Sequence, residues 1–142
     1  SLTPQQQAAA VIHETLSPGL IAGPGNDVYE IPDPALGLSV AEMSEEQKEL
    51  LLSVVQTYVL DMEDTHAALR LAEIEDGVDE LHFAWMGPTN FGSESYYRIY
   101  GPTVLIELDH NNGNDHIHAV YRNPSNDYGE GILAEHYARF PH

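Results

Sequence analysis

Acidic and histidine side chains alternate along residues 101–118, whose sequence is GPTVLIELDHNNGNDHIH. The pattern predicts two strands joined by a polar turn, because alternate residues of a strand share one face. Glu107 and Asp109 then lie on one face of the first strand. His116 and His118 lie on one face of the second strand, so the hairpin could bring all four side chains together.

The register of the two strands decides whether these side chains converge. A hairpin symmetric about residues 112–113 would place Asp109 opposite His116 and Glu107 opposite His118. A slip of one residue would break up the set. Two imidazoles and two carboxylates suit a divalent transition metal such as zinc, copper, iron or manganese, with one or two positions open for water or substrate. We therefore hypothesise a metal site, in which hydrolytic and oxidative chemistry both remain open.

Two other interpretations of this patch use no metal. The acids and histidines could simply satisfy each other on a polar face. Alternatively, Glu107 or Asp109 could act as a general base in a metal-free acid–base pair. A non-catalytic module, whose hairpin face forms a binding or interdomain surface, is the alternative to a metalloprotein or metal-dependent enzyme.

Four further side chains are weaker candidates for the same site. His82, on an aromatic strand, and His136, in the last helix, are additional candidate metal ligands. Arg98 could bind an anionic group of a small-molecule substrate. Trp85 could form an aromatic wall beside a pocket. Each has a structural interpretation as well: a hydrogen-bonded core histidine, a buried ion pair or a core aromatic residue.

The composition of the chain narrows the classes of function. It has 142 residues, 23 acids against five basic residues, and a formal net charge of −18. Such a surface repels nucleic acid and anionic membranes, because proteins bind both through clustered Lys and Arg side chains. The charge fits adaptation to saline surroundings, or attraction of cations or of a basic partner. The chain has no cysteine, which excludes disulfides and thiolate metal sites.

Other segments bear on cofactor and location. Residues 23–25 lack the lysine and helix of a phosphate-binding loop, so no nucleotide cofactor is expected. No apolar run approaches the roughly 18 residues of a membrane span. No signal peptide is visible. The sequence does not decide the cellular compartment, and a secreted or periplasmic location is compatible with it. Because the chain begins with Ser1, we expect a processed product or a fragment.

Periodicity predicts one α+β domain over residues 1–142, with a helix and irregular arm (1–43) preceding the main body (44–142). Capping boxes start helices at residues 3 and 44, the first running to about residue 16. A third helical stretch, 62–75, either continues the second as one bent helix or forms a helical hairpin with it. The irregular arm includes an extended piece at 28–31.

Alternating residues predict an antiparallel four-stranded meander sheet, packed with the N-terminal helices and a C-terminal helix. The predicted strands are 81–86, 96–100, 103–109 and 116–122. The last helix, 128–139, is capped by Asp127 and is expected to contribute apolar residues to the core, namely Ile132, Leu133, Tyr137 and Phe140. Arg98 and Arg122, on strands of an acidic protein, are each expected to pair with an acid.

Several segments resemble the bacterial DUF3500 family, which is named for having no assigned function. They are LTPQQQAAAVIH (2–13), VAEMSEEQKELLL (40–52), HFAWMG (82–87), YYRIYGPTVLIELDH (96–110), HIHAVYRNPSNDYG (116–129) and AEHY (134–137). The resemblance implies that the chain is the C-terminal portion of a longer protein, with a shorter turn at 111–115. The missing N-terminal part or a second copy of the chain is then an expected partner. The resemblance supplies no catalytic residues.

Overall fold

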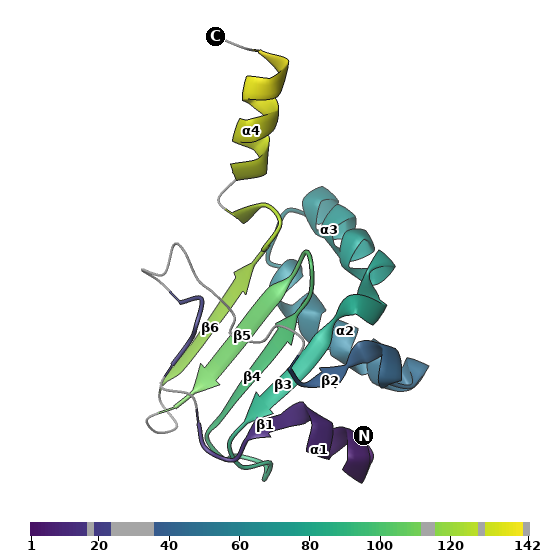
Figure 1. Cartoon of the computed structure of the whole chain (residues 1–142), viewed down its shortest axis with the longest axis vertical. Helices are drawn as coiled ribbons and strands as arrows, with labels where there is room; N and C mark the ends of the chain where they lie inside the picture. Colours follow the sequence, from purple (N-terminus) through teal and green to yellow (C-terminus); the bar gives the residue numbers. More distant parts are fainter. Residues whose placement is uncertain (17–18, 24–35, 112–115, 128–129, 141–142) are drawn as a thin grey trace.

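The computed structural model describes residues 1–16, 19–23, 36–111, 116–127 and 130–140. Figure 1 shows a central twisted sheet with helices packed against it, which confirms the α+β class. The elements in chain order are α1 (Pro4–Ala10), β1 (Val11–His13), β2 (Leu38–Ser39), η1 (Val40–Glu42), α2 (Glu45–Val59), α3 (Asp64–Asp76), η2 (Val78–Glu80), β3 (His82–Met86), β4 (Ser95–Tyr100), β5 (Leu105–His110), β6 (Ile117–Arg122) and α4 (Glu130–Arg139). Within these ranges, no helix is long and apolar enough to cross a bilayer.

The predicted four-stranded meander forms most of the sheet. Strands β3, β4, β5 and β6 pair in that order, each antiparallel to the next. Two short strands extend it beyond β3: β1 pairs in parallel with Trp85 and Met86, and β2 pairs antiparallel with His82 and Phe83. The sheet is therefore mixed, and β6 lies at one end of the strand order.

The first helix is shorter than predicted. Its capping box is confirmed, since the side chains of Thr3 and Gln6 each accept a hydrogen bond from the other residue's backbone N–H. The helix ends at Ala10 rather than near residue 16, and residues 11–13 form β1. β-Branched Val11 and His13 pair with β3, so tertiary pairing overrides the helical pattern. The extended piece predicted at 28–31 lies outside the described residues.

The second and third helical stretches are two separate helices. Ser44 and Gln47 form the predicted capping box of α2. The α2 helix ends at Val59, and Glu63 caps the start of α3 by accepting hydrogen bonds from the backbone N–H groups of the next turn. The break between them is therefore built into the sequence as a new N-cap.

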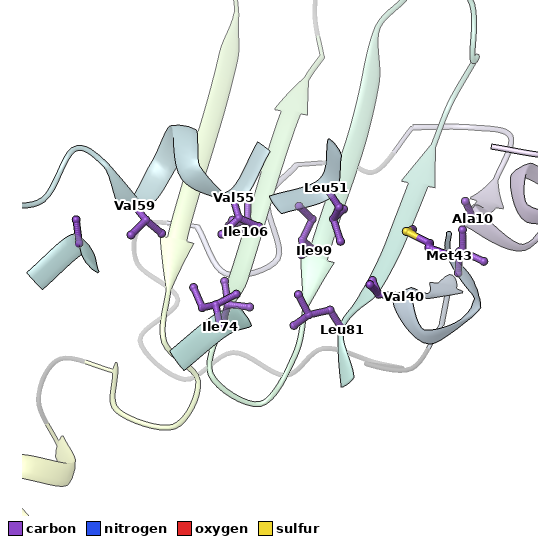
Figure 2. Packing of buried hydrophobic residues seen from close by; sticks show 13 residues of the cluster. Ala10, Val40, Met43, Leu51, Val55, Val59, Ile74, Leu81, Ile99 and Ile106 are labelled. Carbon is purple, nitrogen blue, oxygen red and sulfur yellow. The ribbon is translucent and has the colours of Figure 1, made fainter. Parts of the chain in front are cut away.

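The main core lies between these two helices and one face of the sheet. Figure 2 shows side chains from both helices directed at side chains from the strands. The buried contributors include Leu51, Val55 and Val59 of α2, Ala67 and Ile74 of α3, and Leu81, Ile99, Val104 and Ile106 of the sheet region. This packing leaves the opposite face of the sheet for polar side chains.

The described side chains of the C-terminal helix do not join the core. Figure 1 shows α4 extending away from the sheet. Ile132 is 67% exposed, and Tyr137 and Phe140 are each 57% exposed. The prediction that they contribute to the core is therefore wrong, because the chain after β6 carries the helix away from the sheet. The side chain of Leu133 lies outside the described set.

Gly37 holds β2 close to β3. Its φ is +122°, a conformation that L side chains rarely adopt. A Cβ atom at this position would lie 2.4 Å from the carbonyl oxygen of Phe83. Both the backbone angle and the close approach therefore require glycine.

Candidate functional site

A cluster of buried polar side chains occupies the sheet face opposite the main core. The register places Arg98 opposite Glu107, and Tyr96 opposite Asp109. Directly opposed residues of an antiparallel pair share a face, so these four side chains project from the same side. All four are buried, and three of them carry a guanidinium or carboxyl group. We call this set, together with Arg122 of β6, the polar face.

The register of the β5–β6 hairpin differs from the predicted one by two residues. Asp109 lies opposite His118, and Glu107 lies opposite Val120. The predicted pairs, Asp109 with His116 and Glu107 with His118, are therefore wrong. A shift of two residues keeps every side chain on its predicted face, so the two acids and two histidines still share one face of the sheet. The shift places Glu107 opposite Val120, farther from the histidines along the strand direction.

Glu107 serves as a hydrogen-bond acceptor inside the protein. Its side chain has 0% exposure. Oε1 accepts the backbone N–H of Ile21 at 3.0 Å and the hydroxyl of Tyr96 at 2.6 Å, and Oε2 accepts the backbone N–H of Ala22 at 2.8 Å. The carboxylate thus fixes residues 19–23, which we call the strap, over the polar face. Burial raises the pKa of the Tyr96 hydroxyl, and the charge of Glu107 raises it further.

Two buried arginines complete this arrangement. Nε of Arg122 donates to Oδ2 of Asp127 at 2.6 Å, and Nη1 donates to the carbonyl oxygen of Ala22 at 3.1 Å. The predicted pairing of Arg122 with an acid is confirmed, and Asp127, predicted as a helix cap, is that acid. Arg98 is 2% exposed and donates from Nη2 to the carbonyl of Leu36 at 3.3 Å. As it stands, Arg98 is covered by protein.

Asp109 and the two histidines form a second group at the end of the polar face. Asp109 is 6% exposed, and its Oδ1 accepts no hydrogen bond in the described part of the chain. His116 and His118 are exposed, and their ring centroids lie 4.5 Å apart. Burial raises the pKa of Asp109, and the nearby His118 opposes that shift. We call Asp109, His116 and His118 the His–Asp group.

The weaker candidates lie away from this group. His82 shares the polar face but pairs with Tyr100, level with the far end of β5. His136 is an exposed residue of α4, with its ring 5.3 Å from that of Phe140. Trp85 alternates with the polar-face residues of β3, so it projects from the other face and lines a hollow of about 310 Å³ beside α1. Trp85 and Arg98 therefore do not line one pocket.

The His–Asp group is not assembled into a metal-binding geometry. Across the described ranges, no three His, Asp or Glu side chains lie close enough together to hold a metal ion as they stand. The donor types nevertheless fit a borderline divalent ion, since imidazole and carboxylate suit zinc, iron and copper. A site would form only if the exposed side chains of His116, which precedes β6, and His118, on β6, changed conformation to meet Asp109 at one point.

Comparison with known proteins places the chain in a family. The model of the family described as "Protein of unknown function (DUF3500)" matches residues 1–130. The chain belongs to the DUF3500 family. No curated protein and no solved structure matches it. The DUF3500 match includes every strand of the sheet and ends at the first residue of α4, so the polar face and the His–Asp group belong to the family region.

Sequence reasoning missed the partners of Glu107. The backbone donors at Ile21 and Ala22 lie 86 and 85 residues away in the chain, and no local pattern links them to β5. The available signal was a glutamate inside the apolar run of residues 104–108, because a carboxylate buried in such a strand must be satisfied by internal donors.

Proposed function

We propose that the chain is a metalloprotein that binds a divalent transition metal through His116 and His118. Asp109 supplies the adjacent carboxylate, as a third ligand or as the hydrogen-bond partner that orients His118. The observation that carries the proposal is the buried Asp109 carboxylate. One of its oxygens has no partner in the described chain, and it lies directly opposite one of two neighbouring exposed imidazoles.

The proposal uses fewer ligands than the sequence suggested. Glu107 is left out of the set, because its two oxygens already accept three hydrogen bonds and the register separates it from His118. Two imidazoles and one carboxylate leave coordination positions open on zinc, iron, copper or manganese. Such a metal would activate bound water, or oxygen if it is redox-active. Hydrolytic and oxidative reactions both fit this donor set.

Metal uptake by purified protein tests the proposal. The protein is stripped with a chelator, equilibrated with each of the four metals in turn, dialysed, and subjected to elemental analysis. We expect stoichiometric uptake of at least one metal. We expect uptake to be lost in the His116→Ala/His118→Ala double variant and kept in His66→Ala, since His66 is an exposed histidine on α3. Equal uptake by the two variants, or none by the parent protein, would contradict the proposal.

A second candidate function is a non-catalytic binding or interdomain module. It is supported by α4, which presents Ile132, Tyr137 and Phe140 to solvent and extends away from the sheet. Large apolar side chains that stay exposed on one element can mark an interaction site. The same uptake experiment separates the two functions, because the module requires no metal and predicts identical behaviour of parent and histidine variants.

A further inference from the structure

Two adjoining hollows open on the side of the sheet that carries the main core. One, of about 310 Å³, lies beside α1 and β3 and is lined in part by Trp85. The other, of about 230 Å³, lies beside α2 and is lined in part by Leu50, which is more than half exposed. The two linings share Ser1, Leu2 and Phe83, so the hollows are continuous. We call them together the apolar groove.

The apolar groove differs in charge from the rest of this acidic protein. Among the described residues, no charged side chain lines either hollow, although charged residues make up 20% of the chain. Glu14 borders the next hollow along α1, where the uncharged lining ends. Phe91, two residues after Thr89 of the lining, is fully exposed and adds apolar surface near the groove. The net charge of −18 repels acidic surfaces elsewhere, so the groove is suited to an apolar partner surface.

Helix α4 carries an exposed surface of matching character. Ile132, Tyr137 and Phe140 are each more than half exposed. The centroid of the His136 ring lies 5.9 Å from that of Tyr137 and 5.3 Å from that of Phe140, so the three rings lie on one side of the helix. Ile132 precedes His136 by one helical turn, on the same side. We call these four residues the α4 face. Residues 130–140 hold two acids and one arginine, so this helix adds little to the repulsion between copies.

The α4 face and the apolar groove lie toward opposite ends of the molecule. Figure 1 shows α4 leaving the end of the sheet that is far from α1 and extending away from it. The helix therefore does not cover the groove of its own chain. A second copy offers both surfaces, because its groove can take this α4 while its own α4 enters this groove. A two-fold axis forms both contacts at once and closes the pair.

The area that such a pair would bury is sufficient for a specific dimer. A fully covered aromatic side chain buries about 150–250 Å². From the exposed fractions, the α4 face would bury roughly 350 Å² in the groove, and the groove a similar area. Two reciprocal contacts would then cover roughly 1,400 Å², within the range of about 1,200–2,000 Å² for specific interfaces.

We infer that two copies of the chain exchange α4, with the α4 face of each copy packed in the apolar groove of the other. The inference goes beyond the proposed function, because it uses none of the metal-binding residues. It also gives the exposed apolar residues of α4 a definite partner.

Size-exclusion chromatography with light scattering, run in the presence of a chelator, tests the inference. We expect a dimer that dissociates to monomers on dilution. Trp85 is the only tryptophan of the chain and lines the groove, so its emission should move to shorter wavelength as the dimer forms. Tyr137→Ser/Phe140→Ser should raise the dissociation constant of the dimer at least about tenfold and remove this emission shift. Ala138→Ser, on the other side of α4, should change neither.

A substitution in the groove tests the contact from its other side. Leu50→Glu places a charge at an exposed groove position and should also raise the dissociation constant at least about tenfold. Leu69→Glu makes the same change at an exposed position of α3 outside the groove and should leave the dimer unchanged. A mixture of Tyr137→Ser/Phe140→Ser with Leu50→Glu should pair more tightly than either variant pairs with itself, because the mixed pair keeps one intact contact. Circular dichroism confirms that each variant is folded.

The outcomes separate this inference from the proposed function. A monomer at every concentration would overturn the inference, and so would a dimer that neither the α4 nor the groove substitutions weaken. Equal weakening by Leu50→Glu and Leu69→Glu, or a mixture that pairs no better than its components, would also overturn it. Because the chelator removes metal throughout, none of these results bears on metal uptake, and the result of the uptake experiment leaves the exchange of α4 unaffected.

Discussion

Replacement of Glu107 by glutamine tests the assignment of this residue as the acceptor that holds the strap. The substitution keeps the size of the side chain but replaces one carboxylate oxygen with an NH₂ group. If the amide oxygen takes the place of Oε1, it can still accept from Ile21 and Tyr96. The NH₂ group then faces the backbone N–H of Ala22, which loses its acceptor. The charge opposite Arg98 is also lost.

The expected loss of stability follows from these contacts. A hydrogen bond to a charged group contributes about 1.5–3 kcal/mol, and a buried donor left without a partner costs about 1–3 kcal/mol. The loss of one such bond and the weakening of the remaining two give a decrease of roughly 3 kcal/mol in the free energy of unfolding. For a chain of this size, the midpoint of thermal unfolding should fall by roughly 10 °C.

Urea unfolding followed by Trp85 fluorescence measures the free energy, and amide hydrogen exchange reports on the strap. We expect the amides of Ile21 and Ala22 to exchange slowly in the parent protein and much faster in Glu107→Gln. Glu75→Gln, on the exposed surface of α3, serves as the control and should change stability by less than about 0.5 kcal/mol. A similarly small effect of Glu107→Gln, with unchanged strap exchange, would refute the assignment.

Two further predictions concern Asp109 and Gly37. Burial raises the pKa of Asp109, so the folded state binds this proton more tightly than the unfolded chain, and stability is lost as pH rises above about 4. Asp109→Asn should therefore raise the free energy of unfolding of the metal-free protein at pH 7, and this gain should disappear near pH 3. Urea unfolding at the two pH values measures the gain. An equal gain at both would contradict a raised pKa of Asp109 in the folded state. Gly37→Ala should destabilise by about 3 kcal/mol or more in the same assay, because a positive φ and a Cβ 2.4 Å from the Phe83 carbonyl oxygen both oppose alanine. Normal stability of Gly37→Ala would show that β2 can move away from β3 at little cost.

The strands and their faces could be predicted from the sequence because they depend on local alternation. Residues 105–110 and 117–122 show it, and both became strands with the expected faces. Capping boxes likewise located the starts of α1 and α2. These signals need only neighbouring residues, and the physics that generates them is equally local.

The hairpin register could not be predicted in the same way. It depends on the geometry of the turn, and the residues between His110 and His116 include several turn formers, Asn112 and Gly113 among them. Several loop types therefore fit the same sequence. A shift of two residues leaves every side chain on its predicted face but changes which acid lies opposite His118. Asp109, and not Glu107, therefore lies beside the histidines.

Long-range contacts set the remaining differences. Val11 left the helical pattern because β3 offered a pairing partner 74 positions later, at Trp85. Glu107 is buried because the strap supplies backbone donors from the other end of the chain. The α4 helix is amphipathic enough to predict a core role, but the direction in which the chain leaves β6 decides what its apolar residues meet. None of these contacts leaves a periodic signal in the sequence.

The histidine ring spectrum, recorded by NMR on nitrogen-labelled protein before and after one equivalent of zinc, tests the central claim most directly. We expect the ring nitrogen signals of His116 and His118 to shift on zinc addition, because a nitrogen that coordinates a metal changes its chemical environment. The ring signals of His66 on α3 and His13 on β1 should not move when zinc is added. Unchanged signals from His116 and His118, or equal shifts of all the exposed histidines, would contradict a metal site at the β5–β6 edge.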